Sequence, residues 1–599
     1  MREKSSLKPL LALNKFFVKY KWRLLSGIFF VTISNVFSVL SPVIVRNVLD
    51  QVYSNIDYFH LLGGTAASGK ALHGYIFRLV LISGLLLLAF AVLRGIFMFF
   101  MRQTIIVMSR HIEYDQKNQI YDHYQQLDTT FYKSHTTGDL MSRISEDVSR
   151  VRFYVGPSLM YGINLISLIA LVLYAMIRVS PMLTLYVIAP LPFLAASIFY
   201  VNKIVNRKSE KIQAELSSLT AEAQESYAGI RVLKSFVQEE NAFKAFRKIS
   251  NRYRKSNINL TLTQSVTLPA MNLFVGLSMA TTILIGGWQA VNGNITPGNI
   301  AEFVLYINLL MFPFSAIGWT ANMIQRAAVS QRRINEFLDT RPAIQNAPNA
   351  RAVHLEGKIT FEDVSFVYPH TGIKALNHFS LTINPGEKVA VLGKTGSGKS
   401  TLVHLLLRMY DADSGRVLMD DTPIRDIDLN SLRRQISYVP QDVFLFSDTV
   451  ANNIGMDNGE DESAIRVAAR KAAIENEILE LPEGFQTITG ERGVMLSGGQ
   501  KQRISIARAL NKDSAILIMD ESLSAVDTRT ENAIQQNLNE YLKDKTALVI
   551  THRIFKGWNF DKIIVLEDGV IKEQGTHDEL MALGGHYARL YAYQTLSDE

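Results

Sequence analysis

The chain contains no cysteine among its 599 residues. Disulfide bridges and cysteine-based zinc or iron–sulfur sites are therefore excluded, although the redox compartment stays undetermined. The first half, up to about residue 338, also lacks charge over long stretches, whereas the remainder reads as soluble protein. A net charge of +7 could indicate nucleic acid, but beside apolar runs it is more typical of basic residues at a membrane's cytoplasmic side. We expect a membrane protein and no nucleic-acid partner.

Six apolar segments predict six membrane-spanning helices, because a bilayer core of about 30 Å is crossed by roughly 20 apolar residues. The second segment is the weakest, since Arg94 must snorkel or face protein or water. The length of the first run and the absence of a small-residue cleavage site favour an uncleaved span over a signal peptide. The expected spans are residues 24–45, 76–101, 156–177, 181–201, a fifth beginning near 256 and a sixth ending near 325.

Basic residues predict the orientation of these spans. They are concentrated before the first span and between Lys203 and Lys255, and such residues favour the cytoplasmic side. The N-terminus, the loops 102–155 and 202–260 and the C-terminal half are therefore expected in the cytoplasm, in a multi-pass protein of a bacterial inner membrane. Both loops are expected to be helical. The second could be a self-contained helical hairpin or a lever that touches the soluble domain.

A phosphate-binding loop opens the soluble half. We expect a transmembrane domain at 1–338, a linker at 339–355 and an α/β domain with this P-loop at 356–599. The strand-like "KVAVL" leads into "GKTGSGKS", and the helical "TLVHLLLRM" follows. Glycines let backbone N–H groups close on phosphate oxygens, Lys399 reaches the β and γ phosphates, and Ser400 binds Mg²⁺. The expected nucleotide-binding residues are Gly393, Lys394, Thr395, Gly396, Ser397, Gly398, Lys399, Ser400 and Thr401.

Two further strand-like segments end in residues suited to hydrolysis. "AILIM" precedes Asp520 and Glu521, and we expect Asp520 in the magnesium shell and Glu521 beside the attacking water. "TALVI" precedes Thr551 and His552, where the histidine could contact the γ-phosphate or be structural. A second anion-binding feature is "LSGGQ" at 496–500, whose serine and glycines lie at a predicted helix start.

Taken together, these motifs resemble the nucleotide-binding domain of ATP-binding cassette transporters. "LSGGQ", the P-loop, "YVPQD", "IMDE", "SAVD" and "ITHR" follow that family's order, and "TGDLMSRISEDVSRVR" and "GIRVLKSF" are similar to its cytoplasmic-loop segments. Six spans and one such domain resemble a half-transporter of the multidrug and lipid exporter group. The resemblance therefore implies a six-helix α-helical transmembrane domain followed by an α/β nucleotide-binding domain.

The resemblance also implies roles for individual residues. Tyr368 would stack on adenine, Gln441 would sense Mg²⁺ and the water, Glu491 would meet the cytoplasmic loops, and Asp527 would couple two sites. The "LSGGQ" segment would face ATP bound to the P-loop of a second chain. The implied unit is a dimer holding two ATP molecules, with Mg²⁺ at Ser400, Gln441 and Asp520. The residues expected to complete the partner's site are Leu496, Ser497, Gly498, Gly499 and Gln500.

Mechanistically, the resemblance implies that ATP binding closes the nucleotide domains, that loops near 113–122 and 216–225 transmit this, and that hydrolysis resets the transporter. A homodimer is favoured because every catalytic position is complete, although some segments are similar to a branch with heterodimers. An ATP-gated regulator or channel on the same fold is the alternative class. The sequence "HRIFKGWNFD" departs from the family pattern after His552, which leaves its local packing open.

The substrate is little constrained by the sequence. Apolar spans suit an amphipathic, drug-like or lipid-like compound that moves from the cytoplasm or inner leaflet, but the same residues also face membrane lipid. Glu302 near the outer end of the sixth span is a candidate cavity residue that would meet a cation, because an acid is costly in lipid. The alternative is an interfacial residue just inside the membrane boundary.

Overall fold

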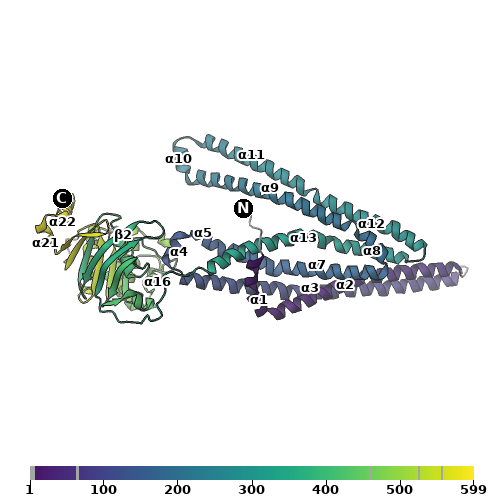
Figure 1. The fold of residues 1–599 in the computed structure, drawn as a ribbon, viewed down its shortest axis with the longest axis horizontal. Helices are drawn as coiled ribbons and strands as arrows, with labels where there is room; N and C mark the ends of the chain where they lie inside the picture. Colours follow the sequence, from purple (N-terminus) through teal and green to yellow (C-terminus); the bar gives the residue numbers. More distant parts are fainter. Residues whose placement is uncertain (1–6, 62–65, 457–460, 524–525, 555–557, 599) are drawn as a thin grey trace. The chain divides into compact units, whose positions relative to one another are not determined.

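The computed structural model describes residues 7–61, 66–456, 461–523, 526–554 and 558–598 (Figure 1). These residues form two compact units. The first comprises the chain up to Tyr124 and Gly138–Thr340. The second comprises Gln125–Thr137 and Arg341–Glu599.

The N-terminal region is helical, and its described part contains six helices that are long and apolar enough to cross a membrane, which confirms the six predicted spans. The main helices are α2 (Lys21–Leu61), α3 (Ala66–Gln126), α7 (Leu159–Val179), α8 (Pro181–Ile188), α9 (Leu191–Ala228), α11 (Glu239–Gln264), α12 (Thr267–Val291) and α13 (Pro297–Leu338). Shorter helical pieces are η1 (Lys8–Leu13), α1 (Asn14–Lys19), α4 (Thr129–Ser134), α5 (Thr137–Ser142), η2 (Arg143–Asp147), α6 (Val148–Phe153), η3 (Tyr154–Ser158) and α10 (Ile230–Ser235).

Several helices continue far beyond the bilayer. Helix α3 has 61 residues and α9 has 38, against the roughly 20 that a span requires. Helices α9 and α11 lie side by side (Figure 1), and Lys208 Nζ on α9 donates to the carbonyl oxygen of Asn259 at 2.9 Å. The loop predicted at 202–260 is therefore a helical hairpin with α10 at its tip. At this tip Phe236 and Val237 are 71% and 81% exposed.

The membrane unit has its core where α2, α7, α8, α12 and α13 meet. Val172 of α7 and Phe303 and Tyr306 of α13 are fully buried there, beside the buried Val39 of α2. The Tyr306 hydroxyl donates to Glu302 Oε1 at 2.9 Å, so this polar group has a partner inside the apolar core. This packing fixes the first half of α13 against the middle of α2 and the second half of α7.

The second unit is built on a six-stranded sheet in the order β10-β9-β3-β8-β7-β6. Its strands are β3 (Lys388–Leu392), β6 (Ile436–Val439), β7 (Ile516–Asp520), β8 (Thr546–Thr551), β9 (Lys562–Glu567) and β10 (Val570–Gly575). All neighbours pair in parallel except β9 and β10. Strands β7 and β8 are buried throughout, as expected for parallel strands covered on both faces. Parallel pairing places the carboxyl ends of β3, β6, β7 and β8 at one sheet edge.

A four-stranded antiparallel sheet in the order β2-β1-β4-β5 and a set of short helices complete this unit. The strands are β1 (Ile359–Val367), β2 (Lys374–Ile383), β4 (Ser414–Met419) and β5 (Thr422–Pro423). The helices are α14 (Lys399–Leu406), η4 (Ile424–Asp426), α15 (Leu429–Arg434), α16 (Val450–Ile454), α17 (Glu462–Lys471), α18 (Glu475–Leu479), η5 (Gly484–Gln486), η6 (Glu491–Gly493), α19 (Gly498–Asn511), α20 (Thr528–Tyr541), α21 (His577–Leu583) and α22 (His586–Asp598).

Candidate nucleotide-binding site

The P-loop connects β3 to α14 through a turn that only glycine can make at two positions. Gly396 and Gly398 have φ angles of +84° and +101°, which side-chain-bearing residues rarely adopt. A Cβ on Gly393 would overlap the carbonyl oxygen of Leu566. The turn therefore presents backbone N–H groups at the start of α14, where the helix dipole favours anions.

Lys399 is folded against its own loop. Its side chain is 6% exposed, and Nζ donates to the carbonyl oxygens of Gly393 at 2.8 Å and Lys394 at 2.9 Å. Nζ also lies 4.0 Å from Glu521 Oε1. Burial lowers the pKa of Lys399, while the charges of Glu521 and Asp520 act in the opposite direction. The ammonium group is thus held inside the loop that the sequence predicts to enclose phosphate.

Asp520 at the end of β7 is a suitable magnesium ligand. Its Oδ1 is buried without a hydrogen-bond partner, and such a group is costly unless something else binds it. Burial raises the pKa of Asp520, and a hydrogen bond from Ser400 lowers it. A carboxylate oxygen and a serine hydroxyl are hard donors of the kind that Mg²⁺ takes together with nucleotide phosphates. The predicted ligands Asp520 and Ser400 therefore lie side by side and fit this ion.

The predicted catalytic residues meet around Glu521. Gln441, which follows β6, donates from Nε2 to Glu521 Oε2 at 2.6 Å. His552, which follows β8, has Nδ1 3.5 Å from Glu521 Oε1. Glu521 itself has a φ of 45°, a left-handed conformation in which few non-glycine residues lie. Four sequence-distant segments thus bring Lys399, Gln441, Glu521 and His552 together at one sheet edge.

Tyr368 follows β1 beside the P-loop helix. Its hydroxyl lies 3.0 Å from Thr401 Oγ1 and 3.1 Å from His404 Nδ1, and its ring makes an edge contact with Tyr410 at 5.5 Å. Burial raises the pKa of the Tyr368 hydroxyl. The Tyr368 residue is only partly buried. Stacking of its ring on adenine stays a prediction.

The "LSGGQ" segment begins α19 with a capping box. The backbone N–H of Gln500 donates to Ser497 Oγ at 3.2 Å, and that of Ser497 donates to Gln500 Oε1 at 2.9 Å. Leu496 is buried, while Ser497 and Gly498 are exposed. The N–H groups of Gly498 and Gly499 have no acceptor within a helix at these positions. They form an exposed, positively polarised helix start.

Glu491 and Asp527 lie at two other exposed turns. Glu491 begins η6, and the following Arg492 has a φ of 52°. Asp527 caps α20 by accepting from the N–H of Thr530 at 3.0 Å. Hydrogen bonds from the side chain and then from the backbone of Thr530 lower the pKa of Asp527. Its predicted coupling role stays a prediction. Ser524 and Ala525 of the "SAVD" segment lie outside the described residues.

Comparisons with known proteins agree with this geometry. Residues 24–314 match the ABC transporter transmembrane region and residues 376–524 match the ABC transporter family. The chain belongs to the ABC transporter family. It is therefore an ATP-hydrolysing transporter with the predicted arrangement of a transmembrane and a nucleotide-binding domain.

Relatives of this ABC transporter come from several bacteria. The chain is 36% identical to the multidrug resistance-like ATP-binding protein MdlA of Escherichia coli, over 79% of this chain and 81% of that protein. It is 35% identical to the ATP-dependent lipid A-core flippase of Aromatoleum aromaticum, over 81% of each chain. The structure of a bacterial Atm1-family ABC exporter with ATP bound has a TM-score of 0.74 and 26% identity, and the match covers 96% of this chain and 98% of that one.

Gln594, which no sequence motif indicates, hydrogen-bonds to the loop around His552 in this ABC transporter; we call residues 551–554 the histidine loop. Gln594 of α22 donates from Nε2 to the carbonyl oxygen of His552 at 3.1 Å and accepts from the N–H of Ile554 at 2.9 Å. Trp558 in the segment that departs from the family pattern is 5% exposed and packs against Phe560. Trp558 therefore anchors the second part of "HRIFKGWNFD" in the hydrophobic core. Residues 555–557 lie outside the described part.

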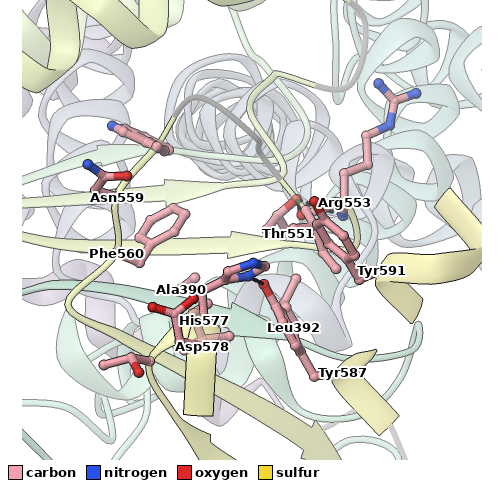
Figure 2. Close-up of a pocket in the computed structure, with 14 residues that line it drawn as sticks. Ala390, Leu392, Thr551, Arg553, Asn559, Phe560, His577, Asp578, Tyr587 and Tyr591 are labelled. Carbon is pink, nitrogen blue, oxygen red and sulfur yellow. Dashed lines mark hydrogen bonds between the residues drawn. The ribbon is translucent and has the colours of Figure 1, made fainter. Parts of the chain in front are cut away.

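A cavity of about 390 Å³ lies behind this loop (Figure 2). Thr551 and Arg553, which flank His552, line it together with Tyr587 and Tyr591 of α22 (Figure 2). The hydroxyl of Tyr587 lies 2.7 Å from His577 Nδ1. No sequence motif indicated this cavity, because its walls come from three distant segments.

Residues 125–137 between α3 and α5 cluster with the nucleotide-binding unit. Asp128 caps α4 by accepting from the N–H of Phe131 at 3.2 Å, and its other oxygen accepts from the N–H of Ala343. Burial lowers the pKa of His404, and the charge of Lys133 adds to this effect. Residues 125–137 therefore belong to the nucleotide-binding unit. They follow soon after residues 113–122, the range that the family resemblance implied for transmitting ATP binding.

Glu302 lies at the start of α13 and is 1% exposed. It lines a cavity in the membrane unit, and its carboxylate pairs with Arg46, whose Nη1 lies 3.1 Å from Glu302 Oε2. Arg46 lies 256 residues away along the chain, and a role of Glu302 in binding a cationic substrate stays a prediction.

Proposed function

We propose that this ABC transporter is an exporter that works as a dimer and uses ATP binding and hydrolysis to switch from an inward-open to an outward-open state. Its cargo would be an amphipathic, drug-like or lipid-like compound taken from the cytoplasm or the inner leaflet. The observation that supports this most is the complete catalytic group around Glu521, in which Gln441, His552 and Lys399 all lie within 4.0 Å of the carboxylate.

Each of these residues has a role in hydrolysis. Glu521 accepts a proton from the attacking water and orients it, because its carboxylate is fixed by Gln441 and His552. Lys399 exchanges its two loop carbonyls for the β and γ phosphates. Asp520, Ser400 and Gln441 would hold Mg²⁺, which neutralises phosphate charge when bound. His552 donates a hydrogen bond to the γ-phosphate region and restrains Glu521.

Two features support the dimer. The start of α19 presents free N–H groups from the exposed Gly498 and the half-buried Gly499, and a phosphate of a second chain's ATP would satisfy them. The tip of the α9–α11 hairpin exposes Phe236 and Val237, and large exposed apolar groups in a cluster indicate a protein contact. In the dimer, Asp527 and Glu491 would transmit nucleotide binding between the sites and to the helices.

Export from a bacterial cytoplasm is supported by the relatives, whose names describe multidrug resistance and a lipid flippase. We place the N-terminus and the nucleotide-binding domain in the cytoplasm, because basic residues are concentrated there. A heterodimer with a homologous half-transporter is a second possibility. An ATP-gated channel is less well supported, since such a regulator has no need of an intact Glu521.

The first test is ATP hydrolysis by the purified chain alone in lipid nanodiscs. Wild-type turnover should fall by about 100- to 10,000-fold in Glu521→Gln, with nucleotide binding retained. Glu540→Gln on the exposed face of α20 is a matched control that should keep its activity. ATP-dependent uptake of amphiphiles into inside-out vesicles then tests transport. Turnover without any vectorial transport would favour a regulator, and silence despite ATP binding would favour a missing partner chain.

A further inference from the structure

The membrane unit contains a cavity of about 440 Å³ bounded by α2, α7 and α13. Arg46 follows the uncharged run 24–45, Arg178 lies in the last turn of α7, and Glu302 lies near the start of α13. These positions are the ends of three spans that the expected orientation places at the outer surface. A cavity of this size falls within the range of small-molecule sites, about 300 to 1,000 Å³.

Glu302 is already paired and hydrogen-bonded inside the membrane unit. Its Oε2 accepts from Arg46 at 3.1 Å and from Asn299 at 3.4 Å, and its Oε1 accepts from Tyr306 at 2.9 Å. The side chain is 1% exposed. A buried carboxylate that is paired and hydrogen-bonded in this way is neutralised from within, so it cannot attract a charged amine into the cavity.

Arg178 supplies positive charge that the cavity does not compensate. Its Nε and Nη2 donate to the Tyr174 hydroxyl at 3.0 and 2.8 Å, and the guanidinium lies 5.3 Å from that ring's centre. Within the described residues, no carboxylate pairs with Arg178. A guanidinium has five N–H donors, so donors remain for a ligand. Two arginines face one carboxylate, and the cavity carries an excess of positive charge.

Apart from Asn299 and the two tyrosines Tyr174 and Tyr306, the rest of the wall is apolar. The apolar side chains come from α2 and α7, the helices that carry Arg46 and Arg178. They are Val36, Val39, Leu40, Val43, Leu171 and Val179. A hydrocarbon body would lie along these residues and leave water. Arg178 is exposed in this structure and therefore accessible, and an anionic head would form charge-assisted hydrogen bonds with it.

We propose that this cavity binds an amphiphile with a single anionic head group, a carboxylate or phosphate, whose apolar body lies against α2 and α7. The inference rests on the proposed exporter function where it takes the amphiphile to be cargo. The same chemistry could come from a membrane phospholipid, and the two sources are separable by experiment. Arg178 binds the head group, while Glu302 and Arg46 form the neutral floor beside it.

The test uses a fatty carboxylate with a photoreactive diazirine at its tail and the purified full-length chain in phosphatidylcholine nanodiscs without ATP. Labelled peptides identified by mass spectrometry should come from α2 and α7. Unlabelled fatty carboxylate should protect them, whereas its methyl ester and trimethylammonium analogue should require about tenfold more. Arg178→Gln should raise the half-labelling concentration about ten- to a hundredfold, and Arg178→Lys should restore most of the affinity. Arg94→Gln, an exposed arginine of α3, is the matched control and should change nothing.

Adding an anionic phospholipid to the nanodiscs separates the sources. If the anionic phospholipid displaces the probe and vesicles accumulate no fatty carboxylate in the presence of ATP, the natural occupant is lipid. ATP-dependent accumulation of the fatty carboxylate in vesicles identifies the occupant as cargo. Equal protection by the ammonium analogue, unchanged labelling in Arg178→Gln, or no labelling of α2 and α7 would each overturn the anion site. Because labelling needs no ATP, it can succeed where export fails, and export of cationic compounds can succeed where labelling fails.

Discussion

The side-chain amide of Gln594 joins helix α22 to the carbonyl oxygen of His552 at 3.1 Å, and its oxygen accepts from the N–H of Ile554 at 2.9 Å. One side chain therefore fixes the backbone on both sides of Arg553. Helix α22 is itself held at its first turn by Glu573 of β10, which accepts from the N–H of Tyr587 at 3.0 Å. The position of His552 against Glu521 thus depends on a C-terminal helix that no catalytic motif includes.

We expect Gln594→Ala to reduce the maximal rate of ATP hydrolysis about three- to tenfold, because two hydrogen bonds that position His552 are lost. The apparent affinity for ATP should stay within about twofold, since Gln594 does not touch the P-loop. Steady-state kinetics that separate kcat from KM will show this. Gln574→Ala on the exposed face of β10 is the control. An equal loss in both variants, or a change in KM alone, would remove Gln594 from the positioning role.

Tyr368 has a ring and a hydroxyl whose contributions two variants separate. Tyr368→Ala removes the ring that is predicted to stack on adenine and should weaken ATP binding about tenfold, because stacking on an aromatic ring contributes about 1 to 3 kcal/mol per base. Tyr368→Phe loses only the contacts with Thr401 and His404 and should bind nearly as wild type. Equilibrium binding of a fluorescent ATP analogue measures both. Unchanged affinity in Tyr368→Ala would place adenine elsewhere.

The lowered pKa of Lys399 predicts proton uptake when ATP binds at alkaline pH. Burial lowers this pKa below the ordinary 10.5, and bound phosphates would raise it again. Between these two values the free site is deprotonated and the occupied site is protonated, so ATP affinity falls as pH rises through the lowered pKa. Calorimetry of Glu521→Gln in buffers with different ionisation enthalpies measures the uptake. Binding without proton uptake at every pH below the ordinary Lys pKa of 10.5 would contradict the prediction.

The absence of cysteine makes the proposed dimer directly testable. Ser497→Cys and Lys394→Cys in one chain, in the Glu521→Gln background, should give a covalent dimer with a short bis-maleimide when ATP is present. Lys394 is well exposed on the P-loop, so the reagent can reach it. The two single-cysteine variants should give little dimer. A cross-link confined within one chain, or dimer formation that ignores ATP, would argue against ATP held between two copies.

Local sequence was sufficient for features whose residues are neighbours along the chain. The spans follow from uninterrupted apolar runs, and the six predicted helices are present in the described part. The P-loop follows from contiguous glycines between a strand and a helix. Asp520 and Glu521 follow directly from the buried strand β7, since the end of a parallel strand places its next residues at the sheet edge. Hydropathy and the order of residues along the chain predict such features without knowledge of long-range packing.

Contacts between distant segments were decided only by the tertiary structure. The ion pair between Arg46 and Glu302 joins residues 256 positions apart, and no sequence pattern indicated that these two residues would meet. Gln594 reaches the histidine loop, and Asp128 accepts from the backbone of Ala343, across gaps with no shared periodicity. Hydropathy and motif spacing predict the secondary structure and the motifs of a segment. Which partner a buried charged side chain contacts depends on how distant segments pack together.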